Sequence, residues 1–221
     1  VFPDIPYLDE GNYVGVNSEL YSGLWGCAST VADVADQALI LEALRGNLLE
    51  PTENAGTEVW NIWKYSDLNG NTLADPAGYY RVIMNVNDYV AHVDKYRKEN
   101  PTALNFEEKY GVTFDLYIST AIRYKVWAYM MLAKIYGEAI YFDDPLSEYQ
   151  DIAKYPKLGF DQIIDKCLEL MNTGMYGVDG KQITRWRTFL FPSITGENEG
   201  HMRYDRYQFT PQCLLAELYL Y

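Results

Sequence analysis

Residues 114–137 read FDLYISTAIRYKVWAYMMLAKIYG, and this stretch decides the fold. Apolar residues recur every three or four positions and surround nearly the whole helix that they predict, a pattern typical of a centrally buried helix. The one polar stripe contains Arg123 and Lys134, which lie eleven residues apart, close to three helical turns. We therefore expect an all-α domain built around this segment.

The flanking sequence predicts further helices, each with a start or stop signal. Thr30 and Asp33 resemble a capping box at the start of an apolar stripe that ends near Gly46. Asp75–Pro76 is placed to begin a second helix and Asn100–Pro101 to end it. With two shorter segments, the additional helices are expected at residues 30–46, 76–100, 160–174 and from 210 onward.

The rest of the chain is expected to be irregular. Residues 1–28 contain Pro3, Pro6 and several glycines without a period, and predict an irregular arm before a helical domain over residues 29–221. Residues 47–78 are rich in Asn, Gly, Pro and Thr and predict a long loop. Because the sequence stops in the middle of an apolar helical pattern, we expect the chain to be incomplete.

A short echo favours repeated helical hairpins. The sequence LAKIY at residues 132–136 returns as LAELY at residues 215–219. Small Ala beside Leu and Tyr is what helices of the tetratricopeptide type use to approach one another closely. The expected architecture is therefore all-α, with tetratricopeptide-like hairpins and long loops.

Composition narrows the classes of partner. The chain has 31 acidic against 18 basic residues and a net charge of -13, so it repels phosphate backbones, and we expect no nucleic-acid partner. It also contains 21 Tyr, 5 Trp and 8 Phe, more than a core of this size needs. Because Tyr carries a polar tip that suits wet surfaces, we expect some of these rings to face a ligand.

The cysteines do not predict a disulfide or a metal site. Cys167 and Cys213 occur in apolar helical patterns, and we interpret both as small core residues. The segment Leu24–Cys27 resembles a bacterial lipobox, but the acidic sequence before it lacks a continuous apolar run, so we reject that match.

Catalytic signals are sparse, and we expect the protein not to be an enzyme. The two histidines, His92 and His201, are far apart in sequence, and no nucleophile-elbow, zinc-protease or phosphate-loop motif is present. A glycosidase pair is conceivable at Asp143–Asp144 or at Glu197 with Glu199, but adjacent acids on loops more often interact with solvent.

No cofactor or metal is expected either. Residues 67–71, DLNGN, place side-chain oxygens at alternate positions as a calcium loop does. The glycine stands at the fourth position of the loop, whereas the EF-hand motif requires it at the sixth. We interpret this segment as a turn built from Asn and Gly.

An aromatic patch lies within the long loop. Trp60, Trp63 and Tyr65 are surrounded by polar residues, and flat aromatic faces can bind the apolar faces of sugar rings. The alternative is that Trp60 and Trp63, three residues apart, form one turn of a helix that covers the core. The sequence alone leaves both interpretations open.

Four blocks together resemble the N-terminal half of the SusD/RagB family. They are residues 36–47 (DQALILEALRGN), 79–87 (YYRVIMNVN), 123–138 (RYKVWAYMMLAKIYGE) and 215–220 (LAELYL). Their order and spacing match as well. The resemblance implies a non-enzymatic lipoprotein on the outer face of the cell outer membrane, built on tetratricopeptide-type helix pairs, with a C-terminal half and a lipid anchor that this chain lacks.

The resemblance also implies a mechanism. Family members bind an oligosaccharide, or in RagB-like members a peptide, and act as a lid on a SusC-like TonB-dependent transporter. Residues between the first and second helices supply part of the sugar site. Carried to this chain, that region contains the candidate ligand-binding residues Arg45, Trp60, Trp63, Tyr65 and Asn71. The alternatives from other classes are a helical glycoside hydrolase and a tetratricopeptide scaffold for protein partners.

Overall fold

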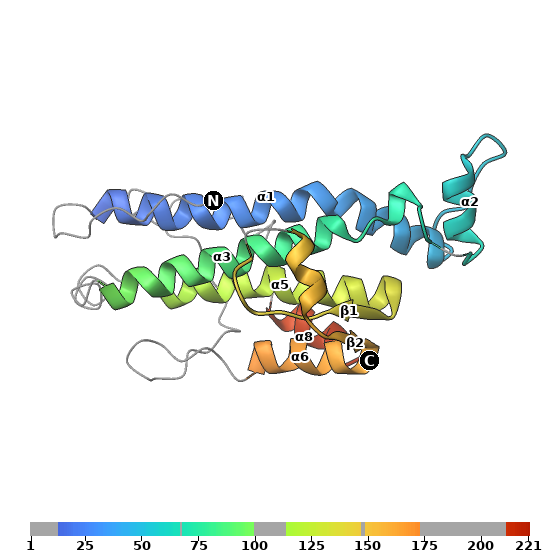
Figure 1. The fold of residues 1–221 in the computed structure, drawn as a ribbon. Helices are drawn as coiled ribbons and strands as arrows, with labels where there is room; N and C mark the ends of the chain where they lie inside the picture. Colours follow the sequence, from blue (N-terminus) through green and yellow to red (C-terminus); the bar gives the residue numbers. More distant parts are fainter. Residues whose placement is uncertain (1–12, 67, 100–113, 147–148, 173–210) are drawn as a thin grey trace.

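The fold is all-α, as predicted, in a computed structural model that describes residues 13–66, 68–99, 114–146, 149–172 and 211–221. Three long helices lie side by side: α1 (Tyr13–Arg45), α3 (Ala77–Glu99) and α5 (Phe114–Tyr136). The shorter helices α6 (Phe160–Asn172) and α8 (Pro211–Leu218) pack against α5 and against each other (Figure 1). Among the described helices, none is both long and apolar enough to cross a bilayer.

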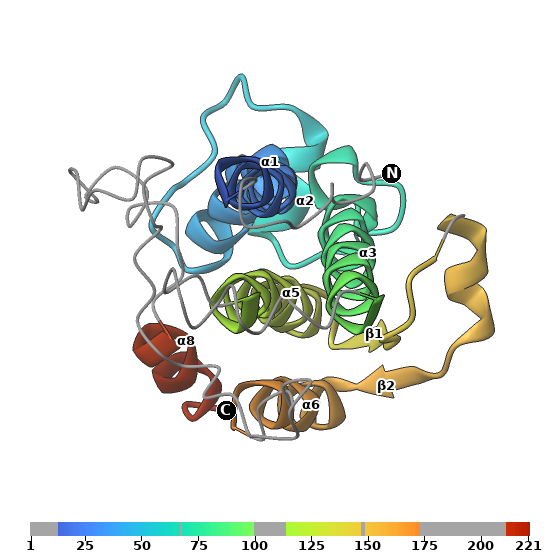
Figure 2. The ribbon, with the colours of Figure 1, turned by 90° about the vertical axis from the view of Figure 1, so that its left-hand side faces the viewer.

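Helix α5 lies at the centre, as its sequence predicted. It contacts α1, α3, α6 and α8, and Figure 2 shows it between the α1–α3 pair and the α6–α8 pair. Val126, Tyr129 and Ala133 are almost completely buried along it. Since each fully buried Val-sized side chain contributes about 1.5–3 kcal/mol, this helix is a main source of the fold's stability.

Helix α1 starts earlier than the sequence suggested. The irregular arm predicted for residues 1–28 was wrong from Tyr13 onward, whereas residues 1–12 lie outside the described part of the chain. Leu24 and Cys27 are fully buried in the core, and α1 packs against both α3 and α5. These tertiary contacts outweigh the low helix propensity of the nearby glycines.

Two details of α1 follow from this earlier start. Thr30 is no helix cap, because its hydroxyl donates to the carbonyl of Cys27 at 2.7 Å, a bond made inside a helix. Cys27 is buried within the helix, in agreement with the rejection of the lipobox. Cys167 is also buried, as predicted, but Cys213 is exposed on α8, so its prediction as a core residue was wrong.

Other helix boundaries match their sequence signals. Helix α3 begins directly after Asp75–Pro76, and α5 ends at Tyr136, directly before Gly137, whose φ of 74° favours glycine. Gly78 allows α1 and α3 to approach closely, because a Cβ there would lie 2.9 Å from a methyl carbon of Val34. The predicted irregular segment at residues 175–209 lies outside the described residues.

Short elements connect the long helices. Strands β1 (Glu138–Ile140) and β2 (Lys157–Gly159) pair antiparallel, with Ala139 opposite Leu158. Between them lies a 3-10 turn, η2 (Tyr149–Lys154). Between α1 and α3, the chain forms α2 (Thr57–Trp63) and the 3-10 turn η1 (Thr72–Ala74). The predicted long loop at residues 47–78 is therefore partly helical.

A small second core holds this connection against the helices. It contains Leu41 and Leu44 of α1, Ile62 of α2 and Ala74 of η1. Leu68 and Ile135 pack against it as partly buried side chains. The second core therefore fixes the segment between α1 and α3 next to the C-terminal end of α5, where the candidate site is found.

Candidate functional site

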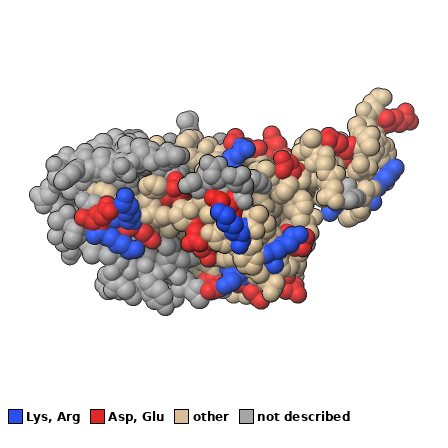
Figure 3. Space-filling view, in the orientation of Figure 1, with Lys and Arg blue, Asp and Glu red and all other residues tan. Residues whose placement is uncertain are grey.

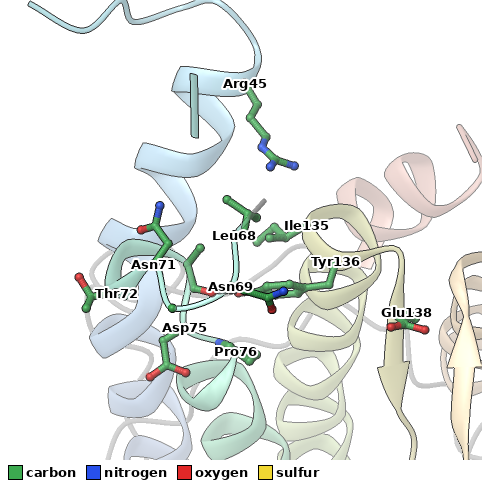
Figure 4. A pocket seen from close by; sticks show the side chains of 12 residues that line it. Arg45, Leu68, Asn69, Asn71, Thr72, Asp75, Pro76, Ile135, Tyr136 and Glu138 are labelled. Atoms are coloured by element: carbon green, nitrogen blue, oxygen red, sulfur yellow. Dashed lines mark hydrogen bonds between the residues drawn. The ribbon is translucent and has the colours of Figure 1, made fainter. Parts of the chain in front are cut away.

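A pocket of about 560 Å³ opens at the end of the molecule where α1 and α5 finish (Figure 4). Its volume falls in the range of about 300–1,000 Å³ that is usual for small-molecule sites. The walls come from the end of α1, the turn before α3 and the end of α5 with β1. The lining residues are Arg45, Leu68, Asn69, Gly70, Asn71, Thr72, Ala74, Asp75, Pro76, Ile135, Tyr136 and Glu138.

The turn at residues 68–76 is held in place by α2. Asn71 is buried, and its side chain accepts from the N–H of Leu73 at 3.0 Å and donates to the carbonyl of Glu58 at 3.0 Å. The carboxylate of Glu58 in turn accepts from the hydroxyl of Thr72 at 3.0 Å. Gly70, with a φ of 72°, allows the chain to reverse.

This geometry changes the role of Asn71. It does line the pocket, as the prediction of a ligand contact requires, but both ends of its amide already have partners within the protein. Asn71 therefore positions the wall of the pocket. The turn interpretation of residues 67–71 fits the described part of this segment, while Asp67 lies outside the described residues.

Other polar groups of the wall are also engaged. The hydroxyl of Tyr136 donates to the carbonyl of Ala74, and burial raises the pKa of this phenol, so the donor remains protonated. Asp75 accepts from the N–H of Ala77 at 2.9 Å and thereby caps α3. Glu138 forms an ion pair with Lys157 on the neighbouring strand.

Arg45 differs from these residues. Its Nε is buried and has no hydrogen-bond partner, and its guanidinium points toward Leu68 and Ile135 in Figure 4. A buried donor without an acceptor costs about 1–3 kcal/mol, a penalty that a bound acceptor would remove. Arg45 is therefore the lining side chain best placed to bind a ligand.

Tyr65 is placed to orient Arg45. The Arg45 guanidinium carbon lies 5.4 Å from the centre of the Tyr65 ring, within reach of a cation–π interaction. The Tyr65 hydroxyl donates to the backbone carbonyl of Arg45. Tyr65 is 61% exposed and does not belong to the described lining of the pocket. Tyr65, predicted as a ligand residue, therefore lies outside the described pocket lining and contacts Arg45.

Trp60 and Trp63 do not share one flat exposed face. Both lie in α2 and are half-buried, and their rings meet edge to face at 89° with centroids 5.6 Å apart. Trp63 packs against the second core, and Lys64 covers the Trp60 ring at 4.9 Å. The predicted helical turn is confirmed for both residues, and its contact with the core is confirmed for Trp63. Binding of a sugar by either ring stays a prediction.

The carboxylate pair proposed for a hydrolase is engaged in the fold. Asp143 accepts from Lys125 at 2.5 Å and from the hydroxyl of Tyr141 at 3.0 Å, and Asp144 accepts from Tyr155 at 2.8 Å. Neither residue lines the pocket. The second pair, Glu197 and Glu199, and His201 lie outside the described residues.

Sequence reasoning missed the contribution of α5 and β1. Tyr136, Ile135 and Glu138 line the pocket although they are far in sequence from residues 45–76. Protein-family models, curated proteins and solved structures gave no match to the chain. The function is therefore inferred from the geometry of the site and from the sequence blocks described above. This geometry, a pocket with an arginine whose buried Nε lacks an acceptor and with a partly apolar wall, suits noncovalent capture of a polar ligand.

Proposed function

We propose that this chain is the helical N-terminal part of a SusD-like protein that binds an oligosaccharide at the outer face of the outer membrane. In this proposal it delivers the ligand to a SusC-like TonB-dependent transporter and performs no catalysis. The resemblance of the four sequence blocks is one support. The all-α fold with α3 and α5 packed side by side is a second.

The observation that carries the proposal is the position of the pocket. It lies beside the segment between α1 and α3, the region where the resemblance places part of the sugar site. Arg45 offers donors for ligand oxygens, while Leu68, Ile135 and the ring of Tyr136 offer apolar surface for the faces of a sugar ring. Two predicted ligand residues, Arg45 and Asn71, are brought together in its wall.

Binding is tested directly with the whole chain. We would immobilise it and measure the retention of oligosaccharides of differing composition, with Arg45→Ala as the site variant and Arg81→Ala, an exposed arginine of α3, as the matched control. Retention of at least one glycan that Arg45→Ala weakens and Arg81→Ala does not would support the proposal. Release of shortened sugars by the unmodified chain would instead favour the hydrolase alternative.

The transporter partner needs a separate measurement. The tagged chain would be purified gently from detergent-solubilised outer membranes of its host, and the proteins that accompany it identified by mass spectrometry. A stoichiometric TonB-dependent barrel protein is the expected result. Its repeated absence, with the tagged chain intact, would favour a scaffold or an enzyme. Retention of peptides rather than glycans in the binding experiment would favour the RagB-like alternative.

A further inference from the structure

We propose that the ligand of the pocket is an acidic oligosaccharide and that Arg45 binds the carboxylate of one of its uronic acid units. This inference rests on the proposed function and names the substrate class of the same site. Among the described residues of the pocket wall, the cation Arg45 has no carboxylate partner.

The acidic side chains of the wall are neutralised or engaged without Arg45. Asp75 caps the first turn of α3, where the positive end of the helix dipole also favours its charge. Glu138 pairs with Lys157 across the β1–β2 strands. Neither carboxylate contacts Arg45, so the guanidinium has no ion-pair partner among the described residues of the pocket wall.

Among the described residues, Arg45 is one of several cations without an ion-pair partner, as Lys64 and Arg81 also are, and it is the one of these three that lines the pocket. With 31 acidic and 18 basic residues, the chain offers an excess of carboxylates to any cation. The lysines of the described structure illustrate this, since several of them contact a carboxylate: Lys125, Lys134, Lys154, Lys157 and Lys166. On the face drawn in Figure 3, acidic and basic side chains are interspersed among the described residues. Arg45 instead has an aromatic ring as its neighbour and a buried Nε without an acceptor.

The surroundings of Arg45 indicate the chemical group that it binds. A guanidinium presents N–H donors in a planar fork that matches the two oxygens of a carboxylate, and Tyr65 supports one side of that plane. A carboxylate on a sugar ring fits this fork, since the ring can lie against Tyr136 and Ile135.

The test compares two probes that differ in charge. Isothermal titration calorimetry would measure the whole chain with an oligomer of galacturonic acid and with the neutral galactose oligomer of the same length and linkage. We expect the acidic oligomer to bind more tightly and its affinity to fall as salt is added. Arg45→Gln is expected to lower the affinity for the acidic oligomer about ten- to a hundredfold and to leave the affinity for the neutral oligomer unchanged. Arg81→Gln is the charge-matched control.

The outcomes separate the two proposals. Tight binding of neutral glycans with no preference for acidic ones would overturn the assignment to Arg45 and leave glycan capture intact. Failure to bind any glycan, with circular dichroism showing a folded chain, would overturn both. Binding of acidic peptides that depends on Arg45, without binding of the galacturonic acid oligomer, would overturn the glycan assignment. Partial recovery in Arg45→Lys, which restores the charge without the fork, would support it.

Discussion

Tyr65 and Arg45 hold each other in two ways, since the Tyr65 hydroxyl donates to the Arg45 carbonyl while its ring lies 5.4 Å from the Arg45 guanidinium carbon. The first contact joins the end of α1 to the residue two positions after α2. The second limits where the guanidinium can point. Tyr65 has a φ of 56°, a left-handed conformation that is uncommon for a residue other than glycine. The pair thus links the backbone of the connection to the side chain that we assign to the ligand.

Replacing Tyr65 should therefore alter binding without direct contact to the ligand. Tyr65→Ala removes both contacts. We expect it to lower the affinity for the acidic oligomer about two- to fivefold, because an exposed cation–π pair contributes about 0.5–1 kcal/mol. Tyr65→Phe keeps the ring and should have the smaller effect. Calorimetry measures both, with Leu48→Ala, an exposed side chain near the same end of α1, as the control. Equal affinities in Tyr65→Ala and the unmodified chain would contradict the orienting role.

Asn71 should act through stability. Its amide bridges the turn and α2, and Asn71→Ala would leave the carbonyl of Glu58 and the N–H of Leu73 without this partner. We expect a loss of about 1–3 kcal/mol in the free energy of unfolding, measured by urea denaturation. Asn54→Ala, an exposed asparagine in the same connection between α1 and α3, is the control. If Asn71→Ala abolished binding at full stability, the residue would be a ligand contact as first predicted.

Periodicity predicted the long helices well because their burial repeats with the helical period. The segment from Phe114 ends within one residue of its predicted boundary, at Tyr136 before Gly137. The start of α1 was missed because its glycines lower helix propensity locally, whereas the core contacts of Leu24 and Cys27 are made with distant segments. Local signals carry no information about such partners.

The site was predictable only in part, for a related reason. The region between the first and second helices was identified, and Arg45 and Asn71 do line the pocket. Whether an amide is available to a ligand or engaged internally depends on Glu58, thirteen residues earlier, which spacing does not reveal. Tyr136 enters the wall through the packing of α5 against α1, which no local pattern encodes.

Lys134 connects three helices, and its removal should loosen two of them. Its ammonium contacts Glu42 of α1 and lies 2.6 Å from Glu217 of α8. We expect Lys134→Met to lower the free energy of unfolding by about 1 kcal/mol, since partly exposed ion pairs contribute little. Urea denaturation of the single and double variants with Glu217→Gln gives the coupling energy. The coupling energy should shrink at high salt. A coupling energy of zero at low salt would show that Lys134 and Glu217 do not stabilise each other.

Lys125 and Asp143 should show an asymmetric response to substitution. Lys125 is buried and its Nζ contacts Asn87 at 2.7 Å and Asp143 at 2.5 Å, whereas the Asp143 side chain is 62% exposed. Asp143→Ala leaves the lysine charge buried without its carboxylate, while Lys125→Met leaves a carboxylate that water can solvate. We therefore expect Asp143→Ala to be the more destabilising change, by about 3 kcal/mol against the unmodified chain.

The control for this pair is an exposed ion pair of the same type. Lys166 and Glu169 lie 2.8 Å apart on the surface of α6, and Glu169→Ala should change the free energy of unfolding by less than about 1 kcal/mol. Thermal and urea unfolding of the three single variants measure the order. A greater loss in Lys125→Met than in Asp143→Ala would show that its packing and its bond to Asn87 matter more than the charge.

Alkaline pH should unfold the protein through its buried phenols and thiols. Burial raises the pKa of Tyr129 above its ordinary value near 10 and raises the pKa of Cys167 to about 12. Above pH of about 9, the unfolded chain therefore releases protons that the folded chain retains, so the free energy of unfolding falls as pH rises. Urea denaturation at successive pH values measures this slope. It should be shallower in Tyr129→Phe, even though that variant also loses the bonds to Phe142, and an unchanged slope would show that Tyr129 does not contribute.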